Sequence, residues 1–175
     1  MRARRETGAG KTNDFEDRFM VEQTSGQISC LLIPVQGKNL LLPNASIAEI
    51  VDYQAPEPVE DGADWFLGYI RWRGLRLPLM SYDKANKSAS GAKSTHTRIA
   101  VTNTIGDKHK QMPFMAFVTQ GLPRLMKVRS EEVSAHEKAD LGPMDKMMVK
   151  VSGEEAIIPS LEQMELLALQ AVSAR

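Results

Sequence analysis

The chain has 175 residues, of which 42% are hydrophobic and 25% are charged, so it is not a largely disordered chain. The 22 lysines and arginines balance the 22 aspartates and glutamates, and no global field attracts nucleic acid or anionic lipid. A single cysteine, Cys30, excludes an internal disulfide, and every apolar run falls far short of the roughly 20 residues that span a bilayer. We therefore expect a cytoplasmic protein without membrane insertion.

The expected organisation is a flexible tail over residues 1–27 followed by one domain over residues 28–175. The tail is rich in glycine and polar residues and has no sustained apolar pattern. The domain contains two sets of short apolar segments separated by turn residues, which predicts strands. The predicted strands cover residues 30–35, 40–42, 50–53, 65–72 and 75–80 in the first set, and 98–103, 113–119, 125–128, 147–151 and 156–158 in the second. Residues 83–96, rich in Lys, Ser and Ala, read as a linker between the sets.

Strands at this spacing, without long alternating helices, predict an antiparallel barrel or sandwich. One short helical turn is expected after Pro43, capped by Asn44 or Ser46, because Ser46 and Glu49 have S-x-x-E spacing. A longer helix is expected at the C-terminus. There Ser160 and Gln163 form an S-x-x-Q box, and apolar residues follow with a helical period. This helix is expected to lie against the barrel.

Candidate catalytic and metal-binding residues do not assemble into a site. His96, His109 and His136 lie in polar surroundings without metal-ligand spacing, and Cys30 lies in an apolar strand as an inert core thiol. Residues 8–12 read Gly-Ala-Gly-Lys-Thr but lack the first glycine of a phosphate-binding loop. We therefore expect no enzymatic activity, no cofactor and no metal.

Residues 65–80 are the most informative part of the chain, because aromatic residues, three arginines and two glycines meet there. Gly68 inside a predicted strand indicates a bulge or the close approach of another backbone. Arg73 and Gly74 form a predicted turn that presents a guanidinium. Trp, Tyr and Arg are the residue types that anchor protein interfaces. In a simpler interpretation, the aromatic residues fill a barrel and the arginines are solvated.

Two segments resemble a known family. Residues 47–50 read Ile-Ala-Glu-Ile, similar to a V-x-E-I turn, and residues 68–81 are similar to a G-V-x-N-L-R-G-x-x-x-P-x-x-D segment. Both motifs, at this spacing, resemble the CheW-like domain, the scaffold of bacterial chemotaxis arrays. The Asn, Leu and final Asp of this segment fall on Arg71, Trp72 and Ser81. The second half matches less well, since Thr119 or Gln120 replaces a family acid and the closing segment 156–164 lacks its Asp.

The resemblance implies a mainly β fold of two intertwined, five-stranded, SH3-like barrels with a C-terminal helix. It also implies a non-catalytic adaptor of a two-component chemotaxis system, recruited to membrane-associated receptor arrays. The implied partners are a CheA-type histidine kinase, the cytoplasmic tip of a methyl-accepting chemoreceptor and other CheW-like proteins. The departures suggest a pathway other than flagellar swimming, for example one that controls type IV pili.

The family's receptor-binding groove lies between the barrels, and the matching positions near it are Ile47, Glu49, Gly68 and Arg73. The expected partner-binding residues are Ile47, Glu49, Gly68, Arg71, Trp72, Arg73 and Gly74. The alternative is a small β-barrel that binds nucleic acid, supported only by the cluster of Arg71, Trp72, Arg73 and Arg76. We expect the adaptor, and therefore no nucleic-acid partner.

Overall fold

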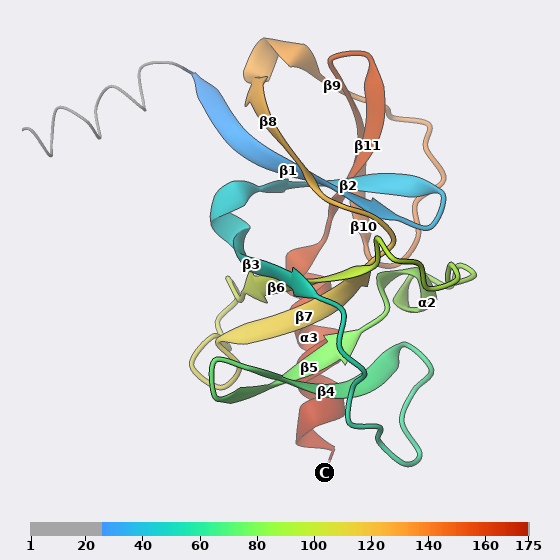
Figure 1. Ribbon diagram of the computed structural model, residues 1–175. Helices are drawn as coiled ribbons and strands as arrows, with labels where there is room; N and C mark the ends of the chain where they lie inside the picture. The colour runs from blue at the N-terminus through green and yellow to red at the C-terminus, as the bar shows by residue number, and fades with distance from the viewer. Residues whose placement is uncertain (1–25, 175) are drawn as a thin grey trace, which may run out of the picture.

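The computed structural model describes residues 26–174 (Figure 1). The predicted tail lies outside this range except at its end, where Gln27 already belongs to the first strand. The strands are β1 (Gln27–Val35), β2 (Lys38–Pro43), β3 (Ile47–Asp52), β4 (Phe66–Trp72), β5 (Leu75–Met80), β6 (Arg98–Asn103), β7 (Phe114–Thr119), β8 (Arg124–Arg129), β9 (Val133–Ala135), β10 (Asp145–Val151) and β11 (Glu154–Pro159). The helical elements are η1 (Asn44–Ser46), α2 (Tyr82–Ala85), η2 (Ser130–Glu132) and α3 (Leu161–Ser173).

The strands form two sheets, which confirms the predicted mainly β class. A six-stranded sheet has the order β8-β1-β2-β11-β10-β9, and a five-stranded sheet has the order β3-β6-β7-β5-β4. Most pairs are antiparallel, while β11 pairs with β2 and β5 with β7 in parallel. The two sheets differ from the expected closed five-stranded barrels. Within residues 26–174 both ladders are open, and the short strand β9 adds a sixth member to one of them.

Three apolar clusters explain why the strands have almost continuous apolar runs rather than strict alternation. Each sheet has a smaller cluster of its own, and the largest cluster lies between the two sheets. In β1, Cys30 and Leu32 face the cluster of the six-stranded sheet, while Ile33 and Val35 face the largest cluster. A strand with both faces buried needs apolar residues at every position. The run Cys30–Val35 is therefore the consequence of a strand shared by two cores.

Helix α3 closes the largest cluster, running behind the five-stranded sheet in Figure 1. Its buried stripe includes Leu161, Met164 and Ala168, as the helical period predicted. Ser160 is the N-cap, and its side chain accepts a hydrogen bond from the backbone of Gln163 at 3.4 Å. The backbone N–H of Ser160 donates to Met144 instead, at 2.8 Å. In a full capping box, the side chain of Gln163 would accept this N–H. Because Met144 already accepts it, only the Ser160 half of the expected box is present.

The cap predicted around Ser46 is wrong. The turn η1 is present, but its N-cap is Pro43 and no side chain caps it. Glu49 lies in β3, which pairs with β6. The β-branched residues Ile47, Ile50 and Val51 favour this strand, and its pairing outweighs the local capping signal.

The expected linker over residues 83–96 differs from the structure at its beginning. Helix α2 occupies residues 82–85, and Tyr82, Asp83 and Asn86 are buried, whereas residues 87–96 are mostly exposed. The side chain of Ser81 accepts a hydrogen bond from the backbone of Lys84 at 3.3 Å and caps this helix. Aspartate and serine are both good N-caps, so Ser81 preserves a function suited to the family's Asp.

A buried carboxylate holds α2 against the other sheet. Asp145, at the start of β10, accepts hydrogen bonds from Lys38 Nζ at 2.8 Å, from Asn86 Nδ2 at 3.0 Å and from the backbone of Gly142 at 3.0 Å. The hydroxyl of Tyr82 donates to the same carboxylate. Burial raises the pKa of Asp145, but these hydrogen bonds outweigh it and the pKa lies below its usual value. We name this group the Asp145 junction.

Candidate partner-binding site

The turn between β4 and β5 presents the most exposed part of the expected site. Arg73 and Gly74 form a two-residue hairpin loop, with φ values of 48° and 77°. Positive φ at both positions is the backbone of a type I′ turn, which glycine adopts without strain. The turn places the side chain of Arg73, which is 68% exposed, at the tip of the hairpin.

Glu49 joins this hairpin to β3. The indole N–H of Trp72 donates to Glu49 Oε2 at 2.8 Å, and the guanidinium of Arg73 lies 3.1 Å from the same oxygen. The Arg73 guanidinium also lies 4.9 Å from the Trp72 ring centroid. Strands β3 and β4 are the opposite ends of the five-stranded order, so these contacts show that the sheet is rolled. We name the three residues the Glu49 clasp.

The ring of Trp72 anchors the clasp in the core. It is buried in the cluster of the five-stranded sheet and lies edge-on to Phe114, with ring centroids 4.9 Å apart. The aromatic ring therefore fills the interior while its N–H reaches the rim, as an amphipathic side chain does. This combines the two interpretations of residues 65–80, because the ring packs in the core and the polar edge serves the site.

Glu57 gathers the other two arginines of the region. Its carboxylate lies 3.4 Å from Arg71 Nε and 3.1 Å from Arg76 Nε. The hydrogen bonds from Arg76 and Arg71 hold the pKa of Glu57 below its usual value. Arg76 also stacks on Tyr69, 3.5 Å from the ring centroid. Every arginine of the cluster is paired with a carboxylate, so the surface is mixed in charge rather than a basic face for single-stranded nucleic acid.

Gly68 is buried and shapes the backbone rather than presenting a surface. Its φ is 119°, and a Cβ there would overlap the carbonyl oxygen of Glu57. Glu57 and Tyr69 exchange two backbone hydrogen bonds, of 2.8 and 3.0 Å. The expected close approach at Gly68 is thus confirmed, and the approaching backbone is that of the loop between β3 and β4.

Ile47 lies on β3 before a register shift that separates it from Glu49. It is half-buried and packs against the largest core cluster. The structure therefore brings Glu49, Trp72 and Arg73 into direct contact, and gathers Arg71 and Gly68 around Glu57. Ile47 belongs to the same strand as Glu49 but contributes to the packing between the sheets.

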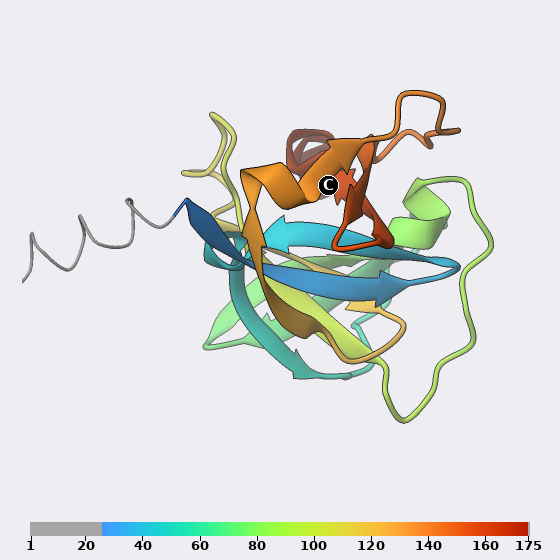
Figure 2. The same cartoon turned by 90° about the horizontal axis from the view of Figure 1, so that it is seen from above.

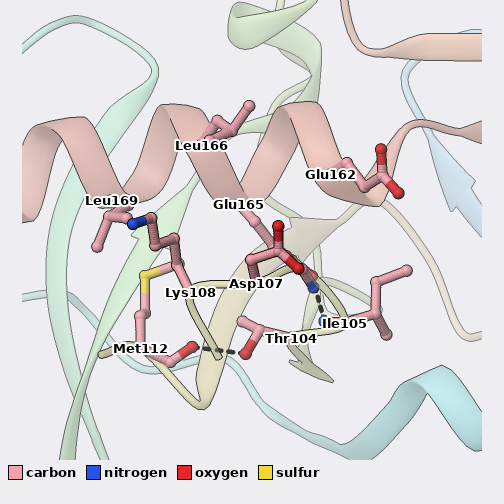
Figure 3. A pocket seen from close by; sticks show the side chains of 10 residues that line it. Thr104, Ile105, Asp107, Lys108, Met112, Glu162, Glu165, Leu166 and Leu169 are labelled. Atoms are coloured by element: carbon pink, nitrogen blue, oxygen red, sulfur yellow. Dashed lines mark hydrogen bonds between the residues drawn. The ribbon is translucent and has the colours of Figure 1, made fainter. Parts of the chain in front are cut away.

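A cavity of about 310 Å³ lies between α3 and the loop that joins β6 to β7 (Figure 3). Its walls include the apolar side chains of Met112, Leu166 and Leu169. The buried carboxylate of Glu165 accepts hydrogen bonds from the backbone N–H groups of Ile105 at 2.6 Å and Gly106 at 2.8 Å. Sequence reasoning missed Glu165, although its place beside Met164 on the buried stripe was a signal. Its oxygens already have donors, so it fixes the loop on the helix.

The described residues offer little for catalysis or metal binding. Within residues 26–174, no three His, Cys, Asp or Glu side chains gather as metal ligands, and His96, His109 and His136 are exposed. Burial raises the pKa of the Cys30 thiol, opposite to the shift that activates a nucleophile. None of the helices in this range is long and apolar enough to cross a membrane.

The family model described as "CheW-like domain" matches residues 29–170. The chain belongs to this family. Among solved structures, it is similar to the crystal structure of the scaffolding protein TtCheW from Thermoanaerobacter tengcongensis, with a TM-score of 0.64 and 13% identity. That match covers 75% of this chain and 88% of the other, and it shows a shared fold. No curated protein sequence matches the chain.

The match confirms the CheW-like domain that the two motifs indicated, and it extends the resemblance into the second half of the chain. It assigns this protein to chemotaxis signal transduction as a scaffold or adaptor. The two sheets and α3 are the corresponding architecture.

Proposed function

We propose that this CheW-like protein is a non-catalytic adaptor that couples chemoreceptors to a CheA-type histidine kinase, working where the cytoplasmic receptor tips assemble. The observation that carries the proposal is the Glu49 clasp. It sets a guanidinium at an exposed tip beside the ring of Trp72, and the half-buried Ile47 lies on the same strand as Glu49. A receptor helix with an apolar stripe and a polar flank would fit such a surface.

The clasp suits binding because its parts are held in place before a partner arrives. Arg73 is oriented by Glu49 and by the Trp72 ring, so little side-chain entropy is lost on binding. Glu49 is 39% exposed and therefore remains open to a competing donor. Gly68 and Gly74 contribute backbone geometry, and Arg71 contributes a second guanidinium held by Glu57.

The departures from the family pattern support a pathway other than flagellar swimming, such as control of type IV pili. Trp72 and Arg71 replace the family's Leu and Asn, and both build the observed surface. Trp72 supplies the indole donor to Glu49, and Arg71 pairs with Glu57. A partner selected by this surface would differ from one selected by the family pattern.

The test is a binding measurement with the full chain, using receptor cytoplasmic fragments and the CheA-type kinases encoded in the same genome. We expect Arg73→Ala to weaken receptor binding by about 5- to 150-fold, equivalent to about 1–3 kcal/mol for a desolvated polar contact. Ile47→Asp should weaken it further by charging an apolar contact. Arg124→Ala is the matched control, since Arg124 is an exposed arginine paired with Glu154 on the other sheet.

Each variant must keep the wild-type melting temperature, above all Ile47→Asp, because Ile47 packs against the core. A double-mutant cycle then shows whether Ile47 and Arg73 act on one partner. Folded variants that bind receptor and kinase like wild type would show that the site is misassigned.

A further inference from the structure

Two arginines lie directly opposite each other on the β4–β5 hairpin. Arg71 on β4 and Arg76 on β5 are register partners, and their side chains are 68% and 47% exposed. Strands β4 and β5 lie at the end of the molecule remote from the six-stranded sheet, below that sheet in Figure 1 and behind it in the view from above in Figure 2. We name these two residues the arginine pair.

The arginine pair shares a single carboxylate. Glu57 Oε1 lies 3.4 Å from Arg71 Nε, and Glu57 Oε2 lies 3.1 Å from Arg76 Nε. Within residues 26–174, neither arginine forms a salt bridge with a second carboxylate. Two positive charges thus face one negative charge, which leaves one positive charge uncompensated. Arg124 differs, because it has Glu154 to itself.

The geometry leaves hydrogen-bond donors for another acceptor. Both arginines approach Glu57 through Nε, and no hydrogen bond joins their terminal Nη groups to a carboxylate in the described part of the chain. The guanidinium of Arg76 is held 3.5 Å from the ring centroid of Tyr69, which is buried. These donors are therefore partly oriented before a partner arrives, and less entropy is lost on binding.

Folding does not require this arrangement. Exposed ion pairs contribute little to stability, and like charges directly opposite each other on neighbouring strands reduce it. The loop that carries Glu57 is already fixed to β4, because Glu57 and Tyr69 exchange two backbone hydrogen bonds. The second arginine is thus better explained by binding than by stability.

We propose that the arginine pair binds one acidic side chain of the partner protein, whose carboxylate lies beside Glu57 and neutralises the remaining positive charge. Guanidinium groups recognise carboxylates through charge-assisted hydrogen bonds from paired N–H donors. A polyanion such as nucleic acid fits less well, because the same loop carries the exposed acids Glu60, Asp61 and Asp64. The inference rests on the proposed function, since it names the chemistry of the partner at this hairpin.

The test titrates the full-length protein with a peptide that has one acid, acetyl-Ala-Ala-Glu-Ala-Ala-amide, and with the same peptide carrying glutamine instead. The NMR signals of the arginine Nε–H groups report binding. We expect the glutamate peptide to shift the signals of Arg71 and Arg76, and the glutamine peptide to leave them in place. The Arg124 signal is the internal control and should stay unchanged, because Glu154 already compensates its charge. Raising the salt concentration should reduce the shifts, because the site is exposed.

Two variants change the charge of the site in opposite directions. Glu57→Gln removes the carboxylate already present and should strengthen binding of the glutamate peptide by about 2- to 5-fold, the value of an exposed ion pair. Arg71→Gln leaves one arginine with one carboxylate and should weaken binding by about the same factor. Glu154→Gln is the matched control, since it removes the partner of Arg124 on the other sheet and should leave the signals of the arginine pair unchanged.

Three outcomes would overturn the proposal. A Glu57→Gln variant that binds the peptide no better than wild type would show that the arginine pair has no positive charge available for a partner. Equal shifts at Arg124 would show unspecific attraction. Larger shifts with inorganic phosphate than with the glutamate peptide, at equal ionic strength, would show a phosphate site instead of a site for an acidic side chain.

The failure of this inference is distinguishable from the failure of the adaptor function. The peptide titration needs neither receptor nor kinase, so it can fail while the full chain still binds both. A wild-type chain that binds the peptide but neither receptor nor kinase would contradict the adaptor function and support the acidic-side-chain site. If both hold, Glu57→Gln should also strengthen the complex that uses this hairpin, and an unchanged or weaker complex would overturn the inference.

Discussion

The Glu49 clasp and the Asp145 junction use nearly the same chemistry at different depths. Each joins a carboxylate to an aromatic donor and a cation: Glu49 to Trp72 and Arg73, and Asp145 to Tyr82 and Lys38. The Asp145 side chain is only 1% exposed, and it also takes donors from Asn86 and Gly142. The Glu49 side chain is 39% exposed.

Burial decides what each group can do. At Asp145 the removal of one partner leaves a desolvated charge, so the group must stay assembled and holds the two sheets together. At Glu49 water replaces any lost contact, so the ion pair adds little stability and remains available for exchange with a partner. The comparison therefore predicts that variants of the junction damage the fold, while variants of the clasp damage binding.

The largest effect is expected for Asp145→Ala. It removes the acceptor for Tyr82 and Asn86 and leaves the Lys38 ammonium, which is 24% exposed, without its counter-ion. We expect a loss of about 2–4 kcal/mol in the free energy of unfolding, measured by urea denaturation. Tyr82→Phe is the control that removes a single donor and should cost less. A loss below about 1 kcal/mol for Asp145→Ala would show that the junction is not structural.

The next largest loss of stability is expected for a substitution at Gly68. Gly68→Ala introduces a Cβ at positive φ and into the Glu57 carbonyl, so we expect a loss of about 2 kcal/mol. Gly74→Ala also has positive φ, but open space surrounds that position, and about 1 kcal/mol is expected. Thermal unfolding of both variants measures the difference. Equal losses would mean that the loop does not press on Gly68.

The pH dependence should separate two buried aspartates. Burial raises the pKa of Asp83 above its usual 3.8 despite hydrogen bonds from Gln36 and Gln120, whereas the pKa of Asp145 is lowered. Asp83 therefore binds its proton more tightly in the folded state, and its contribution to stability grows as pH falls from neutral toward 3.8. Asp145 contributes stability above pH 3.8, and that contribution is lost as pH falls through its lowered pKa.

Urea midpoints measured from pH 7 to pH 2 check both signs. Asp83→Asn should remove the rise toward pH 4, and Asp145→Asn should remove the fall below it. A wild-type curve that falls steadily from pH 7 would contradict the assignment for Asp83.

The smallest effect on stability is expected at the clasp. Arg73→Ala should change the free energy of unfolding by less than about 1 kcal/mol, because its ion pair with Glu49 is exposed and screened. Chemical denaturation in low and high salt measures this value. A larger loss would mean that Arg73 stabilises the rolled sheet. The weaker receptor binding of Arg73→Ala would then have to be compared with its loss of stability.

The sequence predicted the strands well, since their apolar residues lie at spacings that two buried faces require. It could not predict that Trp72 would meet Glu49, because that contact depends on how far the five-stranded sheet rolls. Residues 83–96 resembled a linker, since Asn86 finds its partner Asp145 only after the second sheet has formed. Strand β9 has three residues, too few for an alternation to show.

The order of the strands has a consequence for synthesis. The five-stranded sheet uses β3 to β7 without interruption, whereas the six-stranded sheet joins β1 and β2 to strands made much later. On the ribosome, the five-stranded sheet can form as soon as β7 has emerged. The hairpin of β1 and β2 must wait until β8 and β11 have been synthesised. During this delay the apolar edges of β1 and β2 lack partners and are open to wrong pairing. We expect nascent chains that stop before residue 124 to recruit chaperones strongly, and the time spent translating residues 98–159 to limit the yield of folded protein.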